Sequence, residues 1–251
     1  MAHEVEDAGG RRRLVEALAM AQVELLDTAE RLPPESLSVF VDDPADPSGL
    51  LTIAWGAGPL GFSNEASLTA ARITSLEELL GCLPRGHGTY RLTVPFWAAP
   101  AVSSLFKCEL SGPVARYALL QGEPAPHPAA GQTEPLAPDD LDIVAFAFPR
   151  AVPEAPHRAL ILKDELVAVA ITTHLAGGVA RIGVHVGEEH RGRGFGGGVA
   201  RALIADLRAR DLAVTAEVAL ASEPAVRMAE GLGLSIIDAR LAFHLAGQHP
   251  A

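Results

Sequence analysis

A cluster of glycines between an apolar segment and an amphipathic helix constrains the fold of this 251-residue chain more than any other feature. Residues 179–186 are apolar enough for a strand, and residues 194–210 have the apolar spacing of a helix. The turn between them carries Arg191 and Arg193 beside the glycines. The first backbone N–H groups of a helix lack partners within the helix and lie at the positive end of its dipole. Because glycines let a ligand approach those groups closely, the segment predicts a site for a phosphorylated ligand.

Acidic residues outnumber basic ones, and the excess lies in the first part of the chain. The formal net charge is -11; residues 1–149 hold 9 basic and 20 acidic residues, and residues 150–251 hold 11 of each. Such a chain is a poor nucleic-acid binder, so we expect no nucleic-acid partner. The acidic part either attracts cationic substrates or, more simply, keeps the protein soluble.

The composition favours a soluble protein of the cytoplasm. Apolar runs are shorter than the roughly 18 residues that span a bilayer, and the acidic N-terminus differs from a secretory signal, so we expect no membrane association. The two cysteines, Cys82 and Cys108, do not have metal-ligand spacing and need not pair. We therefore expect a reducing compartment and no metal.

A proline-rich segment divides the chain. Five prolines lie between Gly122 and Pro138, which predicts a linker at 122–138 between an N-terminal mixed α/β domain at 1–121 and a second domain at 139–251. For the first domain the apolar patterns predict helices at 11–31, 74–83 and near 98–107, and strands at 38–41, 50–55, 89–96 and 114–120. For the second they predict a helix at 140–148, strands at 159–163, 166–174, 179–186, 212–220 and 234–245, and helices at 194–210 and 224–232. This order indicates an α+β fold with a mixed sheet.

Two motifs occur in the second domain at a fixed separation. The turn from Arg191 to Gly196 fits R-x-x-G-x-G, and the segment from Ser222 to Leu234 follows N-x-x-A-x-x-L-Y-E-x-x-G-F. Together, over about residues 139–245, they resemble the GNAT superfamily of N-acetyltransferases. The resemblance implies an acyl-CoA N-acyltransferase fold, acetyl-CoA as cofactor, and direct attack of a primary amine on the thioester in a ternary complex. The smaller N-terminal domain is interpreted as a degenerate copy of the same fold.

The resemblance also implies the residues of the site. The cofactor-binding residues would be Val184, Val186, Arg191, Gly192, Arg193, Gly194, Phe195, Gly196 and Ser222, with the N–H of Val184 or Val186 polarising the thioester carbonyl. Glu188 and His185 lead as the base, with Glu189 and His174 as alternatives. Two positions depart from the family pattern: Ala229 replaces the usual tyrosine that protonates the thiolate, and Ser222 replaces an asparagine. The acceptor would be the amine of a small molecule or a peptide, and exposed edge strands would allow a homodimer.

Two other functions remain open at this point. The residues from Gly192 to Gly197 also fit G-x-G-x-x-G, and Glu217 follows about 20 residues later, as in a dinucleotide-binding oxidoreductase. The polar turn before Gly192 and the short remainder of the chain argue against this fold. A non-catalytic acyl-CoA-binding module is the other alternative, and Ala229 favours it.

Overall fold

The computed structural model describes residues 2–7, 10, 37–43, 49–55, 64–70, 73–83, 88–120, 124, 126–145, 147–148, 151–176 and 178–245. The chain forms two compact units, one of Met1–Val114 with Ala239–Ala251 and the other of Ala115–Asp238. The units meet at residues 114–115 and 238–239, whereas the sequence predicted domains at 1–121 and 139–251. The end of the chain belongs to the first unit because its last strand pairs there, and the proline-rich segment belongs to the second.

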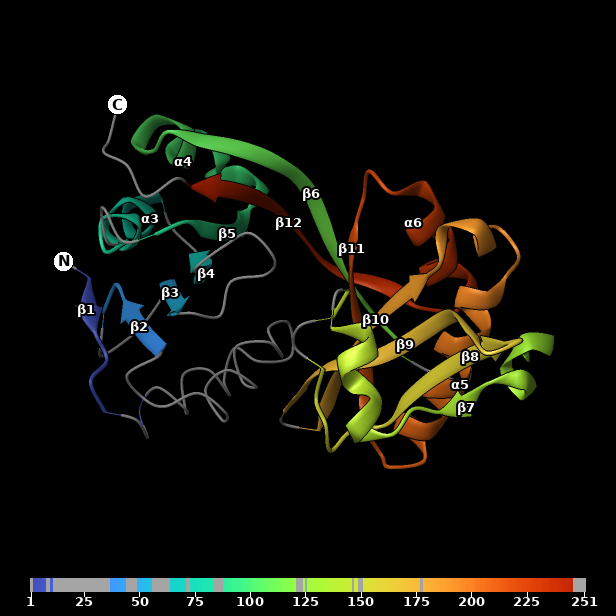
Figure 1. The fold of residues 1–251 in the computed structure, drawn as a ribbon. Coiled ribbons are helices and arrows are strands. Elements are labelled where there is room, and N and C mark those ends of the chain that lie inside the picture. The colour runs from blue at the N-terminus through green and yellow to red at the C-terminus, as the bar shows by residue number, and fades with distance from the viewer. Residues whose placement is uncertain are drawn as a thin grey trace. The chain divides into compact units, whose positions relative to one another are not determined.

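The first unit is a mixed sheet covered by short helices (Figure 1). Strands β1 (His3–Glu4), β2 (Leu37–Val41), β3 (Gly49–Ala54) and β4 (Asn64–Ala70) are antiparallel neighbours. Helix α3 (Ile73–Leu80) connects β4 to the parallel strand β5 (Tyr90–Pro95). The segments η3 (Phe96–Ala98) and α4 (Ala99–Leu105) follow, and residues 240–245 of β12 (Ser235–Leu245) pair antiparallel with β5.

The second unit contains the same order of elements in longer form. Strands β7 (Glu134–Pro135), β8 (His157–Leu162), β9 (Glu165–Ala176) and β10 (Val179–Val186) are antiparallel neighbours. Helix α5 (Phe195–Arg208) connects β10 to the parallel strand β11 (Ala213–Ala219), and α6 (Glu223–Gly231) follows. Strand β6 (Cys108–Ala118) is the neighbour of β11. The mainly antiparallel sheet does not fit a dinucleotide-binding fold, which is mostly parallel.

Three short 3-10 segments complete the second unit. They are η4 (Pro128–Gln132), η5 (Pro138–Val144) and η6 (Glu188–His190). The predicted helix at 140–148 is therefore wrong, since a 3-10 segment that begins at Pro138 takes its place. Part of the predicted linker is structured, because η4 and β7 lie within it. The predicted helix at 11–31 lies outside the described residues, and β4 was not predicted.

Helix α5 and η5 cover opposite faces of the second unit's sheet (Figure 1). Leu203, Ile204 and Leu207 of α5 are fully buried against alternate residues of β9 and β10. On the other face, Val144 of η5 packs on Ile171 of β9. A Cβ atom at Gly183 of β10 would lie 2.4 Å from Phe148 Cε1, so only glycine lets the phenyl ring lie on the sheet here.

The folded state contains a buried neutral histidine, which makes stability depend on pH. His157 is 2% exposed; its Nε2 lies 2.9 Å from the carbonyl of Val152, and its Nδ1 accepts from the N–H of Thr172 at 3.2 Å. An imidazole that accepts at Nδ1 and donates from Nε2 is neutral. Burial lowers the pKa of His157 below its usual value, and the hydrogen bond to Val152 opposes this in part.

We expect the stabilisation from His157 to be lost as the pH falls. Above the unfolded-state pKa, near 6.5, both states are neutral; below it the unfolded state takes up a proton first, until the pH passes the lower folded-state pKa. The variant His157→Asn should be less stable than wild type by about 1–3 kcal/mol at pH 8, and the difference should narrow below pH 6.5. Denaturant unfolding of both proteins from pH 8 to pH 5 measures this, and a constant difference would contradict it.

Candidate functional site

A pocket of about 690 Å³ lies in the second unit, beside the glycine turn, within the size range of small-molecule sites. Residues of β10, of the turn, of α5 and of α6 line it, together with one residue that precedes η4: Val184, His185, Val186, His190, Arg191, Gly192, Gly194, Phe195, Gly196, Gly197, Arg201, Ser222, Pro224, Ala225, Arg227, Met228, Gly231 and His127. The strand–turn–helix segment that the sequence singled out thus forms most of the pocket wall.

One wall of the pocket is the end of β10, where this strand is no longer paired with β11. The parallel ladder between β10 and β11 ends at the pair Ile182 and Ala216, although β10 continues to Val186 and β11 to Ala219. Beyond Ile182, β10 is therefore paired on one edge only, with β9. Such an edge presents backbone groups that can bind an extended ligand.

The direction of the backbone groups on that edge follows from the register. Gly187 donates its N–H to the carbonyl of Val167, 2.9 Å away, and Val186 is opposite Ala168. Bonded and non-bonded pairs alternate along an antiparallel ladder, so Val184 and Val186 turn their N–H groups away from β9. Both N–H groups therefore lie on the edge of β10 where pairing with β11 has ended.

The glycine turn adds a second set of donors. Gly192 and Gly194 have positive φ angles of 77° and 79°, where a side chain would strain the backbone. Gly194 is the N-cap of α5 without a side-chain capping bond, and the first internal helix bond runs from Gly198 N–H to Gly194. The N–H groups of Phe195, Gly196 and Gly197 are consequently outside the helix ladder. A Cβ atom at Gly196 would lie 3.0 Å from Val186, so α5 lies closely on the end of β10.

The pocket is cationic although the chain is acidic. Arg191, Arg201 and Arg227 line it, and none of the described lining residues is an aspartate or glutamate. Arg227 is exposed and paired with Glu223 at 2.8 Å, whereas Arg201 is half-buried and donates to the carbonyls of Gly197 and Gly231 at 3.1 and 2.7 Å. Such a lining favours an anionic ligand.

The predicted cofactor residues come together, with one exception. Val184, Val186, Arg191, Gly192, Gly194, Phe195, Gly196 and Ser222 all line the pocket, whereas the exposed Arg193 does not. Ser222 is the N-cap of α6 and makes no side-chain capping bond. Ala229 is 2% exposed and belongs to the core cluster beneath the pocket.

The candidate bases are placed very differently from one another. His185 lines the pocket. Burial is the main cause that lowers the pKa of its imidazole, and the positive charge of Arg191 is the second. The imidazole is therefore neutral at pH 7. Glu188 and Glu189 are exposed in η6 and do not line the pocket.

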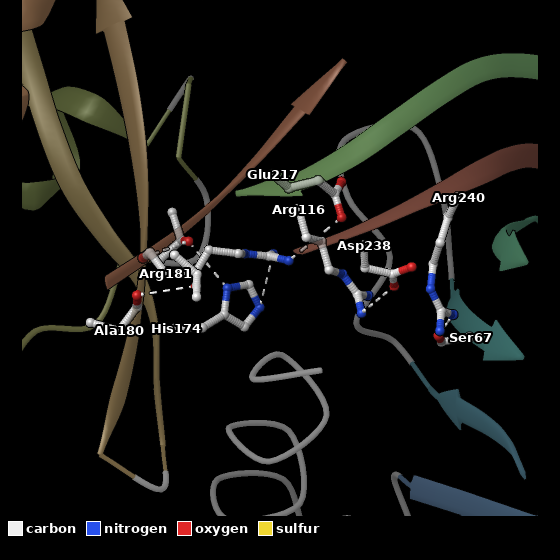
Figure 2. A network of polar contacts seen from close by, with 10 residues as sticks. Ser67, Arg116, His174, Ala180, Arg181, Glu217, Asp238 and Arg240 are labelled. Carbon is white, nitrogen blue, oxygen red and sulfur yellow. Dashed lines mark hydrogen bonds and ion pairs between the residues drawn. The ribbon is translucent and has the colours of Figure 1, made fainter. Parts of the chain in front are cut away.

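His174 belongs to a buried network (Figure 2). Its Nε2 lies 3.3 Å from Arg181 Nη2 and its Nδ1 lies 3.1 Å from Thr173 Oγ1, while Arg181 Nη1 lies 3.9 Å from Glu217. Both ring nitrogens of His174 are thus engaged, which suits a structural residue rather than a base.

Two lining residues were missed by sequence reasoning. His127 lies in the segment taken as a linker, and no periodicity could have revealed it. Arg201 was detectable, because it lies seven residues after Gly194 and hence on the face of α5 that begins at the turn. Two further findings concern the described residues: they contain no helix able to span a membrane and no cluster of three or more potential metal ligands.

Comparison with known proteins gives a family-model match over part of the chain and similar folds over most of it. Residues 161–242 match the family described as FR47-like protein. No curated protein matches the chain. A GCN5-related N-acetyltransferase from Sphaerobacter thermophilus has a TM-score of 0.66 at 14% identity, covering 99% of this chain and 96% of that chain.

Two other solved structures are similar over nearly the whole chain. A GCN5-related N-acetyltransferase-like protein from Streptococcus suis has a TM-score of 0.64 at 14% identity, covering 95% of this chain and 99% of that one. A tandem GNAT protein from the clavulanic acid biosynthesis pathway has a TM-score of 0.57 at 15% identity, with coverages of 98% and 99%. At such identities the likeness shows the fold. The FR47-like match lies over the region that carries both motifs and, together with this fold, supports the resemblance to the GNAT superfamily.

Proposed function

We propose that the protein is an acyltransferase that moves an acetyl group from acetyl-CoA to a primary amine in a ternary complex. The observation that carries this proposal is the convergence of three features on one pocket: the open edge of β10, the glycine turn before α5 and a lining whose described residues include arginines but no carboxylates. Acetyl-CoA combines an extended arm with a diphosphate, and each part matches one of these features.

The residues present fit such a ligand. The positive φ angles of Gly192 and Gly194 turn the backbone into a concave run of N–H groups, which is the form of many phosphate sites. Arg191 lies at this turn, with its Nε 3.4 Å from the carbonyl of Val186, and its guanidinium adds charge. The peptide groups of Val184 and Val186 are available to the arm.

When bound, acetyl-CoA supplies an activated acyl group. The N–H of Val184 or Val186 is the available donor for the acyl oxygen and would stabilise negative charge on it. His185, as a neutral imidazole, would accept the proton of the amine, directly or through water. Ala229 carries no proton to give, so protonation of the leaving thiolate is left to water.

A non-catalytic acyl-CoA-binding module is the second candidate, and Ala229 is the observation that favours it. Loss of one general acid typically lowers the rate by about 10²–10⁴-fold. Because the CoA thiolate is a good leaving group, this loss would slow acyl transfer without abolishing it. Release of CoA that depends on an added amine would separate the two candidates, because only the enzyme produces it.

The first test is thermal unfolding of the protein with acetyl-CoA, CoA, NAD or NADP. We expect acetyl-CoA and CoA alone to raise the melting temperature, since a ligand at about 100 times its Kd stabilises the folded state by roughly 2.7 kcal/mol. No shift with either CoA compound, or a shift with a nicotinamide nucleotide, would contradict the proposed function.

The variant Gly194→Asp should weaken CoA binding at least about tenfold, a loss of roughly 1.4 kcal/mol. The new carboxylate would stand at the anion site, where Cβ already lies 3.1 Å from the His127 ring. Gly178→Asp is the matched control, because Gly178 also has a positive φ, of 76°, but has open space around it and does not line the pocket. Titration calorimetry should show a loss with Gly194→Asp alone; equal affinities would refute the site.

The reaction should require neutral His185. Because burial and Arg191 lower its pKa, the base form persists to lower pH than for an ordinary histidine, and activity should fall only below about pH 6.5. The ratio of kcat/KM of wild type to His185→Gln, measured with one amine, cancels the ionisation of the amine. We expect a ratio of about 10²–10⁴ that is constant near pH 7–8 and declines on acidification. A ratio near one at all pH values would exclude this base.

A further inference from the structure

We propose that His127 binds the diphosphate of the acyl donor from the side facing the glycine turn, so that the anion is held by two separate segments of the chain. This inference rests on the proposed function and extends it to a residue that lies outside both sequence motifs.

The imidazole of His127 lies directly against the turn. A Cβ atom at Gly194 would be 3.1 Å from His127 Nε2 and 3.3 Å from Cε1, and both residues line the pocket. The glycine at 194 is thus required twice, by its φ of 79° and by the ring above it. The Nε2 atom is therefore beside the first N–H groups of α5.

The hydrogen bonds of the ring determine what Nε2 offers to a ligand. Nδ1 accepts a hydrogen bond from the backbone N–H of Ala129 at 3.2 Å. A neutral imidazole that accepts at Nδ1 carries its proton on Nε2, so the atom beside the turn is a donor. A phosphate oxygen is the acceptor that suits a donor in a pocket where none of the lining residues that the structure describes is a carboxylate.

The position of His127 is set by close packing between η4 and α5. A Cβ atom at Gly198 would lie 2.7 Å from Ala129 Cβ and 3.1 Å from its carbonyl carbon, so the two backbones approach closely only because residue 198 is glycine. Two hydrogen bonds close the η4 turn. The N–H of Ala130 donates to the carbonyl of His127, and the hydroxyl of Thr133 donates to the carbonyl of Ala130. These contacts fix the place of η4 against α5 and thereby support the imidazole.

The test is titration calorimetry of the full chain with CoA and with dephospho-CoA, which keeps the diphosphate but lacks the 3′-phosphate. The variant His127→Ala should raise the Kd of both ligands by the same factor, about tenfold or more, as for a lost hydrogen bond to a charged group. His127→Gln, which keeps a donor, should recover part of the affinity. Gln132→Ala, an exposed change in the same segment, is the control and should leave both Kd values unchanged.

A second variant tests the support. Gly198→Ala adds the methyl group that Ala129 excludes, while alanine favours the helix more than glycine does, so α5 should remain folded. We expect it to weaken CoA binding, and the double variant His127→Ala with Gly198→Ala to be no weaker than His127→Ala alone, because both changes remove the same contact.

The outcomes are distinct. Wild type that binds neither ligand would overturn the proposed function, and this inference with it. Wild type that binds both, with His127→Ala unchanged or weakened for CoA only, would overturn the inference alone. Fully additive losses in the double variant would show that Gly198 acts independently of His127, which would contradict the role assigned to η4.

Discussion

The candidate site depends on a β-ladder that ends early. Strands β10 and β11 separate after Ile182, and the backbone N–H groups of Val184 and Val186 are left on an edge without a strand. Unpaired backbone groups are costly when buried and are useful where a ligand can pair with them. The remaining features follow from this separation, because α5 starts beside the open edge and its glycine turn brings further N–H groups to the same pocket. The donors are fixed by the backbone, so few side chains need to be specified.

The first unit shows what closes such an edge. Its parallel ladder between β4 and β5 also ends early, at Ser67 and Thr93, although β4 continues to Ala70. There the buried guanidinium of Arg240 donates to the carbonyl of Leu68 at 3.0 Å and to Ser67 Oγ at 3.1 Å (Figure 2). Between β4 and α3 the sequence has only Ala71 and Arg72, with no glycine. The shared order of elements supports the interpretation of this unit as a degenerate copy, and Arg240 takes the place that a ligand would need.

Sequence reasoning recovered the parts of the fold that have local signals. Apolar patterning predicted the strand at 179–186. Turn chemistry predicted the hairpin turn at Lys163 and Asp164, and both of these residues have a positive φ. Strand β4 alternates apolar residues at 66, 68 and 70 with polar ones at 65, 67 and 69, but most of them are small, so the signal is weak and the strand was missed. The structure of the proline-rich segment was not predicted for another reason. It depends on the packing of Ala129 on Gly198, a contact between residues far apart in sequence. For the candidate site, the motifs predicted most of the residues that line the pocket, whereas His127 required the tertiary structure.

In the proposed function, one arginine would connect binding of the anion with the proton transfer. Arg191 lines the pocket and, after burial, is the second cause of the lowered pKa of His185. Charges interact strongly only within about 8 Å in physiological salt, so the local arginines and not the net charge of -11 determine the field at this imidazole. A bound diphosphate would offset the charge of Arg191 and raise the pKa of His185 towards its ordinary value. The imidazole would then be a stronger base in the presence of the acyl donor than in its absence, so that proton uptake from the amine is favoured when the donor is in place.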